Sequence, residues 1–284
     1  MNMPADVTAS AVAAGEHDII EILNAETDAG VVLQNTGAGT VAYYSEKRPG
    51  KTTANEDSLG IIPLNNDDCV LLVADGMGGM PCGDQASRLA VEQISLSLQD
   101  AEETESGYRT AVLNGIDAAH DAIVKLAVGA GSTVAMVEIW KQMARAYHVG
   151  DSEILVVGQR GKVKFQSIPH SPVGYAVQSG MLDQSEALHH DDRHIISNFL
   201  GDAEMSIEIG FNIKLARFDT VLIASDGLFD NLYLNEIIDI IRKGRLRRAG
   251  EKLAQLVNAR MLGADSGHPS KPDDVSFILF RRSG

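Results

Sequence analysis

The sequence predicts an α+β protein in which antiparallel strands are covered by amphipathic helices. Residues 133–168 hold four short apolar segments separated by tight turns, which is typical of an antiparallel meander. Residues 84–98 and 108–128 instead carry apolar side chains three and four positions apart, the spacing of a helix that buries one face. Because these two helices follow each other directly, we expect them to cover one face of a sheet.

The remaining segments extend this pattern towards both ends of the chain. Short apolar groups between residues 19 and 44 are expected to form early strands, and residues 275–280 a last strand. Residues 235–243, capped by Asn235, and residues 245–262 are each expected to form a helix. The order of segments therefore predicts a sheet protein with helices early and late in the chain.

Composition narrows the classes of function. The 284 residues carry a formal net charge of −15, whereas nucleic acids and anionic membranes are bound by surplus lysine and arginine. Cys69 and Cys82 provide no disulfide framework, and the first residues lack the features of a secretory signal. No stretch reaches the ~18 consecutive apolar residues of a membrane span. We expect a cytoplasmic protein that binds neither nucleic acid nor membrane, with a flexible tail over residues 1–16 and one domain over residues 17–284.

Two segments share one design, an apolar strand that delivers an aspartate followed by glycine. Residues 70–74 are all suited to a buried strand and lead to Asp75, with glycine at three of the next four positions. Residues 220–224 lead in the same way to Asp226 and Gly227. An Asp-Gly pair after a strand can be an ordinary turn. It can also place a carboxylate beside a bare backbone carbonyl, and both are ligands that suit Mg²⁺ or Mn²⁺.

Two further acids stand at strand starts, Asp57 before residues 59–62 and Asp273 before the last strand. In an antiparallel sheet the end of one strand lies beside the start of its neighbour, so one edge of a sheet sandwich could collect all four aspartates. Carboxylates without lysine or arginine among them repel one another unless cations neutralise them, so hard divalent metal ions are implied. A solvated loop edge is the alternative for Asp57 and the adjacent Glu56.

Residues 171–192 interrupt the strands with an irregular segment, and a long insertion of this kind is more often functional than idle. Within it, Asp183 could cap a short helix with Glu186 at its third position. Three histidines in this region lie in polar surroundings, where we expect surface positions and no metal binding: His189, His190 and His194.

Seven short motifs together carry a family resemblance, and they lie at residues 55–58, 75–79, 83–87, 131–133, 148–152, 224–230 and 273–276. In order and approximate spacing they resemble the metal-dependent type 2C protein serine/threonine phosphatases, above all their bacterial branch. The agreement extends over about residues 41–280. Each motif alone is weak, but seven in this order are highly specific.

The resemblance implies a four-layer αββα sandwich, two antiparallel sheets packed face to face with helix pairs outside. It also implies two Mg²⁺ or Mn²⁺ ions that share Asp75, one of them held also by Asp226 and Asp273. The implied ligands of the other ion are the carbonyl of Gly76 and, partly through water, Asp57 or Glu56. A third, weaker ion would match Asp151 and Asp230.

The resemblance further implies hydrolysis of phosphoserine and phosphothreonine in proteins by a water that bridges two metal ions. Residues 171–192 would form the flap beside the active site. The expected partners are phosphorylated proteins and a paired serine/threonine kinase, and the protein is expected to be a monomer that acts in signalling.

Two positions depart from the family pattern. Relatives carry an arginine that binds the substrate phosphate where this chain has Thr52, so Lys51, or secondarily Arg48, is the predicted phosphate contact. The usual Asp-Asn pair near the C-terminus is Asp273 and Asp274 here. The alternatives are a catalytically weak module that binds phosphoproteins or a regulatory partner, which the missing arginine favours, and a metal-dependent nuclease, which the net charge opposes.

Overall fold

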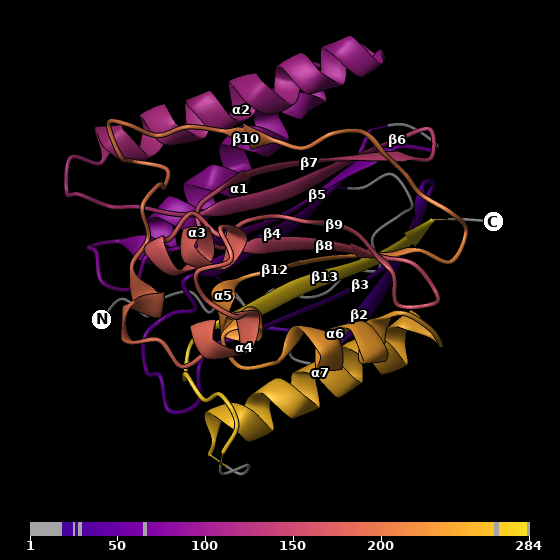
Figure 1. Cartoon of the computed structure of the whole chain (residues 1–284). Helices are drawn as coiled ribbons and strands as arrows, with labels where there is room; N and C mark the ends of the chain where they lie inside the picture. The colour runs from indigo at the N-terminus through magenta and orange to yellow at the C-terminus, as the bar shows by residue number, and fades with distance from the viewer. Residues whose placement is uncertain (1–18, 25, 28–29, 65–66, 264–266, 283–284) are drawn as a thin grey trace, which may run out of the picture.

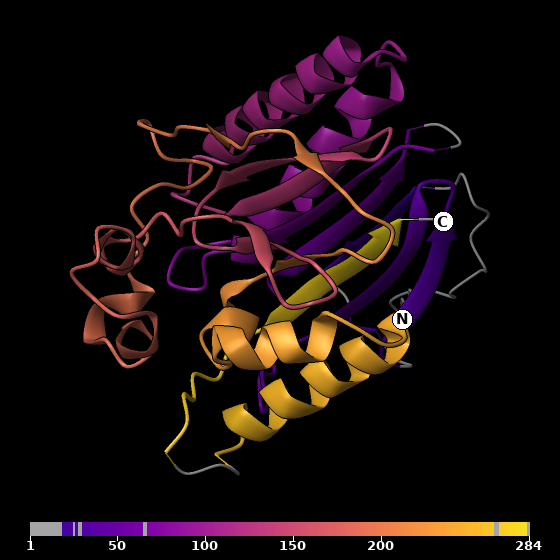
Figure 2. The same cartoon turned by 45° about the vertical axis from the view of Figure 1, so that its right-hand side comes forward.

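The computed structural model describes residues 19–282 except 25, 28–29, 65–66 and 264–266, so the expected tail over residues 1–16 lies outside the described residues (Figure 1). Two antiparallel sheets lie face to face between two pairs of helices, which confirms the predicted four-layer sandwich. Figure 2 shows that a group of short helices projects from one end of this sandwich.

The first sheet has seven strands in the order β1-β4-β5-β6-β7-β10, with β11 also paired to β7. Its strands are β1 (Ile20–Leu23), β4 (Asp57–Pro63), β5 (Cys69–Asp75), β6 (Val134–Trp140), β7 (Met143–Val149), β10 (Glu208–Ile209) and β11 (Ile213–Lys214). The second sheet has six strands in the order β2-β3-β13-β12-β8-β9. They are β2 (Val32–Thr36), β3 (Gly39–Glu46), β8 (Glu153–Val157), β9 (Val163–Gln166), β12 (Thr220–Ala224) and β13 (Val275–Arg282).

Two long helix pairs form the outer layers (Figure 1). The helices α1 (Gly83–Gln99) and α2 (Glu105–Lys125) cover the first sheet, and α6 (Leu234–Ile241) and α7 (Leu246–Met261) cover the second. The shorter helices are α3 (Pro172–Gln178), α4 (Gln184–Ala187), the 3₁₀ helix η1 (Asp191–His194) and α5 (Asp226–Phe229). The helices expected at residues 84–98, 108–128 and 245–262 are therefore confirmed, with small differences at their ends.

Strand β5 shows why these residues form a central strand. Its side chains alternate between two apolar layers, because neighbouring residues of a strand face opposite sides of the sheet. Leu71 and Val73 pack between the two sheets, whereas Val70, Leu72 and Ala74 pack under α1 and α2. Both faces are buried, so the strand reads as one unbroken apolar run.

The predicted meander over residues 133–168 is wrong in one respect. The strands β6 and β7 form a hairpin in the first sheet, but β8 and β9 form a hairpin in the second. The chain crosses between the sheets at Gly150, whose φ of 110° favours glycine. A Cβ there would lie 2.6 Å from Cβ of Thr133, so a side chain would also lack room. Hydrophobic periodicity cannot show which sheet a hairpin joins.

Two predicted helix caps have different outcomes. Helix α6 begins at Leu234 and ends at Ile241, so the cap predicted at Asn235 and the extension to Lys243 are wrong. Tyr233 is the N-cap residue, and its backbone N–H donates to Oε2 of Glu236 over 3.0 Å. The cap predicted at Asp183 is confirmed, because Glu186 accepts a hydrogen bond from the Asp183 backbone N–H and completes a capping box at α4.

Candidate metal centre

The four predicted aspartates meet at one edge of the sandwich. Asp57 begins β4 and Asp75 ends β5, and the two residues are direct cross-strand partners. Asp226 follows β12 and Asp273 precedes β13, which is the antiparallel neighbour of β12. Each sheet therefore contributes two carboxylates, as the antiparallel arrangement predicted.

Asp75 is fixed through its backbone by the adjacent loop. Its N–H donates to Oγ1 of Thr133 over 3.1 Å, and its carbonyl accepts from the Thr133 N–H over 2.8 Å. The Ser132 hydroxyl donates to the same carbonyl over 3.0 Å. These contacts explain why the motif at residues 131–133 belongs to the site although it holds no acid.

Two glycines allow the backbone to come close to the acids. A Cβ on Gly76 would lie 2.0 Å from the carbonyl oxygen of Gly83 and 2.8 Å from that of Glu56. A Cβ on Gly227 would lie 1.9 Å from the carbonyl oxygen of Asp274. Real Cβ atoms do not approach backbone this closely, so a side chain at either position would separate the loops that carry the acids.

The acids shift the pKa values of one another. Burial raises the pKa of Asp57 to about 8, and the charge of Asp274 adds to the shift. Burial also raises the pKa of Asp75 well above its ordinary value, with further contributions from Asp57, Asp226 and Asp273. Burial and Asp226 raise the pKa of Asp273 to about 7. Without added cations, this cluster therefore resists full ionisation.

Unpaired buried oxygens indicate that a cation belongs in the cluster. Oδ2 of Asp57 accepts a hydrogen bond from the Ser225 hydroxyl over 2.9 Å, but Oδ1 has no partner within the described part of the chain. Oδ1 of Asp151 is likewise buried and without a hydrogen bond there. A buried carboxylate oxygen without a partner is costly, and a donor set of oxygens suits Mg²⁺ or Mn²⁺. The residues thus fit the predicted metal ions.

The predicted third-ion residues lie next to the main cluster. Burial raises the pKa of Asp151 well above its ordinary value, and the charges of Asp226 and Asp230 add to it. Burial and the charge of Asp226 raise the pKa of Asp230 to about 6. The structure brings these two residues to the Asp226 side of the site.

A lysine that the sequence reasoning missed stands among these carboxylates. The ammonium of Lys271 contacts a carboxylate oxygen of Asp226 at hydrogen-bond distance, and it lies 2.7 Å from Oδ2 of Asp230 and 3.5 Å from Oδ2 of Asp273. The only sequence signal for it was a basic residue two positions before a predicted ligand. The expectation that no lysine lies among the acids is therefore wrong.

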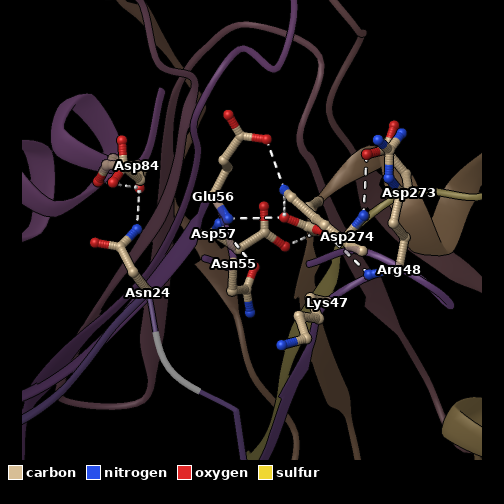
Figure 3. Close-up of polar contacts among 12 residues, drawn as sticks. Asn24, Lys47, Arg48, Asn55, Glu56, Asp57, Asp84, Asp273 and Asp274 are labelled. Atoms are coloured by element: carbon tan, nitrogen blue, oxygen red, sulfur yellow. Dashed lines mark hydrogen bonds and ion pairs between the residues drawn. The ribbon is translucent and has the colours of Figure 1, made fainter. Parts of the chain in front are cut away.

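Lys51 has carboxylate partners rather than an open position. Its ammonium lies 2.6 Å from Oε2 of Glu56 and 2.5 Å from Oδ2 of Asp274. The Asp274 carboxylate also accepts from the backbone N–H groups of Glu56 and Arg48, over 2.7 and 2.9 Å, and Figure 3 shows it between those residues. Asp274, which departs from the family pattern, and Lys51, next to the departing Thr52, thus form one buried ion pair. A phosphate contact of Lys51 stays a prediction.

A cavity of about 300 Å³ separates the projecting helices from the body of the protein and ends at the acids. Its flap side includes Val177, Ala187 and Leu188, and its inner end includes Asp226 and Asp230. The segment over residues 171–192 thus lies beside the acid cluster, where the flap was expected. The predicted surface histidines His189, His190 and His194 are exposed.

His170 fixes the base of this flap. Its ring Nδ1 accepts hydrogen bonds from the Gly150 N–H over 3.1 Å and from the Asn198 amide over 2.7 Å. Nε2 must then carry the proton of the neutral ring, and it donates to Glu208 over 3.2 Å. His148 stacks on this ring, with ring centroids 4.3 Å apart. These histidines and Glu208 could be mistaken for a metal site, but the Nε2 proton of His170 occupies the position that a metal ion would need.

Comparisons with known proteins agree with this geometry. The family described as "Protein phosphatase 2C" matches residues 47–262. A curated relative, "Serine/threonine phosphatase stp" of Listeria welshimeri, is 29% identical over 204 residues, which cover 67% of this chain and 79% of the relative. The crystal structure of "Serine/threonine phosphatase Stp1 from Staphylococcus aureus" superposes with a TM-score of 0.73 at 25% identity, over 90% of this chain and 97% of the other.

A further solved structure shares the fold. It is the catalytic domain of "serine threonine protein phosphatase PstP in complex with 2 Manganese ions", with a TM-score of 0.67 and 21% identity, over 89% of this chain and all of the other (100%).

Proposed function

Because the chain belongs to the protein phosphatase 2C family, we infer that its acid cluster is the metal centre of a phosphohydrolase. The protein is a metal-dependent serine/threonine protein phosphatase with an α+β sandwich fold. We assign Mn²⁺ or Mg²⁺ as its cofactor, two ions in the main site and a weaker third, because the donors are carboxylate and carbonyl oxygens.

The observation that carries this proposal is the pair of orphaned buried oxygens, Oδ1 of Asp57 and Oδ1 of Asp151, at an edge where acids of both sheets converge. Structural ion pairs would satisfy these atoms with lysine or arginine from the chain. Within the described part of the chain these two oxygens instead have no hydrogen-bond partner, so they are available as ligands of an added cation.

The proposed roles follow from position. Asp75 lies at the end of β5, close to Asp57, Asp226 and Asp273, and would bind both main ions. Asp226 and Asp273 would complete the coordination of one ion, and the second ion would take the Gly76 carbonyl with Asp57 or Glu56. Asp151 and Asp230 would hold the third ion. When bound, such ions acidify a water and neutralise charge on the phosphoryl oxygens.

The chain itself orients these ligands and positions the substrate. Ser132 and Thr133 fix the Asp75 backbone, Ser225 holds one oxygen of Asp57, and the flap forms one wall of the cavity beside the acids. We propose Lys51 as a contact of the substrate phosphate. Its side chain is only 5% exposed, and two carboxylates accept from its ammonium. The third N–H of the ammonium is the donor that would contact the phosphate.

The proposed substrates are proteins that carry phosphoserine or phosphothreonine. The proposed partner is a paired kinase in a signalling pathway. We propose that the protein acts as a monomer in the cytoplasm. The free cysteines Cys69 and Cys82 support a reducing compartment. Among the described residues, no helix is both long enough and apolar enough to cross a membrane.

Turnover of a phosphothreonine peptide with Mn²⁺, with Mg²⁺ and after chelation tests the proposal. We expect hydrolysis with either metal and none after chelation, restored when Mn²⁺ is returned. Full activity in excess chelator would contradict the metal centre. Mn²⁺ binding without hydrolysis of any phosphopeptide would favour the weak binding module instead.

A further inference from the structure

Lys271 differs from an ordinary surface lysine because the chain holds it in place. Its backbone N–H donates to Oδ1 of Asn231 over 2.7 Å, and its carbonyl accepts from the same amide over 2.8 Å. The Asn231 side chain is fully buried and also donates to the Gly227 carbonyl over 2.9 Å. Pro272 follows and restricts the lysine backbone to extended conformations.

This double backbone contact directs the Lys271 side chain into the acid cluster. The ammonium contacts Asp226 and Asp230, with Asp273 3.5 Å away, and the side chain is only 20% exposed. The ammonium of Lys271 therefore lies inside a site for cations, within ion-pair distance of three of its carboxylates.

We propose that Lys271 is a built-in competitor of the divalent cation at the Asp226, Asp230 and Asp273 side of the metal centre. In the metal-free protein its ammonium neutralises these carboxylates. A divalent ion that binds there must displace the ammonium from these carboxylates. The lysine would thus set the metal concentration at which this side of the centre fills.

The proposal rests on the metal centre inferred above, and a physical alternative gives the opposite sign. If Lys271 merely held the three carboxylates in a binding geometry, its removal would weaken metal binding. If it competes, removal leaves more uncompensated negative charge and strengthens binding. Two unit charges about 4 Å apart interact strongly enough near a protein surface to change affinity by tenfold or more, so the effect is measurable.

Calorimetric titration of Mn²⁺ into the metal-free full chain tests whether removal of the Lys271 ammonium strengthens or weakens metal binding. We expect Lys271→Met and Lys271→Gln to bind at least one Mn²⁺ about tenfold more tightly than wild type, a difference of about 1.4 kcal/mol. Lys271→Arg keeps the charge and should retain weak binding. The matched control is Lys164→Met, which removes a lysine paired with Asp219 away from the acid cluster and should leave Mn²⁺ affinity unchanged.

A second measurement uses the wild-type protein, so it does not depend on how a variant folds. The rate of amine labelling at Lys271 is followed by mass spectrometry with and without Mn²⁺. Displacement of the ammonium predicts a several-fold faster reaction when Mn²⁺ is present, with Lys164 unchanged.

Unchanged or weaker Mn²⁺ affinity in the neutral variants, or Lys271 labelling that Mn²⁺ does not accelerate, would overturn the competitor role. Failure of every variant and of wild type to bind Mn²⁺ would instead overturn the proposed metal centre itself.

Discussion

Individual carboxylates in the cluster differ in how far the chain balances their charge. Asp274 has an ammonium and two backbone N–H donors, whereas Asp57 has one hydroxyl donor and one oxygen without a partner among the described residues. Substitutions at these positions should therefore have different consequences. Loss of an unbalanced acid should affect metal binding, and loss of a balanced one should affect folding.

Asp75→Asn is expected to lower turnover of a phosphopeptide by at least 100-fold while the thermal melt of the metal-free protein stays near wild type. The amide keeps the size of the carboxylate, and it relieves a buried charge whose pKa is raised by burial. It also removes the ligand proposed to bind both ions. Retention of more than a tenth of the wild-type rate, a barrier change below about 1.4 kcal/mol, would mean that Asp75 is not the shared ligand.

A double-mutant cycle on Lys51 and Asp274 should show strong coupling. Lys51→Met leaves the Asp274 carboxylate, only 4% exposed, without its ammonium, and we expect a loss of about 3–5 kcal/mol in the free energy of unfolding. Asp274→Asn in the Lys51→Met background should recover most of this loss. Urea denaturation of the four proteins measures the coupling. Additive effects would show that Lys51 and Asp274 are not energetically coupled, so the ion pair would not explain the aspartate at position 274.

Glu138 should make stability depend on pH independently of the metal centre. Burial raises its pKa above the ordinary 4.5, and its Oε1 has no partner among the described residues. The folded state therefore keeps a proton that the unfolded state has lost, so stability falls as pH rises from about 4.5 through the raised folded pKa. Glu138→Gln should flatten this fall between pH 5 and pH 8, because the amide binds no proton in either state.

Urea denaturation at both pH values measures the slope for Glu138→Gln and for Glu204→Gln, an exposed control. A glutamine that cannot satisfy its hydrogen bonds lowers stability equally at both pH values. The slope of stability against pH therefore separates this loss of hydrogen bonds from the loss of the titrating carboxyl group. Equal slopes in wild type and Glu138→Gln would contradict a buried, proton-binding Glu138.

Among the elements, the flap has its own attachment to the body. His170, directly before the flap, accepts a hydrogen bond from the Gly150 N–H through its ring, and its carbonyl accepts from the Ser197 N–H over 2.8 Å. The chain before the flap and the chain shortly after it are therefore fixed at one point. The cavity lies under the flap and opens beside the acids. A substrate protein would need this space for residues next to the phosphorylated one, whereas a small phosphate ester would not.

Ala187→Phe should fill part of the cavity and raise KM for a phosphopeptide several-fold. Hydrolysis of p-nitrophenyl phosphate, which has no neighbouring residues, should change less than twofold and serves as the internal control. Parallel steady-state kinetics with the two substrates would show whether the cavity binds the residues next to the phosphorylated one. An equal effect on both substrates would indicate that the substitution disturbs the metal centre rather than a peptide-binding space.

On the scale of the whole molecule, the sequence predicted most of the layers and all four central acids. Strand β5 could be predicted from its unbroken apolar run and helix α1 from the helical spacing of its apolar residues. The place of Asp75 follows directly from the end of its strand. The contacts of Lys51 with Asp274 and of Lys271 with Asp226 could not be predicted, because loops bring these residues together over separations of 223 and 45 residues. The crossing at Gly150 was missed because it depends on tertiary contacts. The cap at Tyr233 is a local contact with Glu236, but it was missed because tyrosine is not among the residues that usually cap a helix.

The metal ions should also stabilise the folded molecule as a whole. The net charge of −15 and the clustered acids favour any state that binds cations, and a ligand that binds only the folded state raises the melting temperature. We expect Mn²⁺ at saturating concentration to raise the melting temperature by several degrees. Sodium chloride at the same ionic strength should raise it less. Equal effects would assign the stabilisation to general screening instead of specific binding.

The origin of the four central acids in both sheets has a mechanical consequence. Asp57 and Asp75 belong to one sheet, and Asp226 and Asp273 adjoin strands of the other, so the spacing between these pairs is the spacing between the sheets. The apolar layer that sets this distance contains Leu71, Val137 and Ile223. Metal affinity should therefore report the thickness of the core, and a core residue that never touches an ion would still tune how tightly the ion is held.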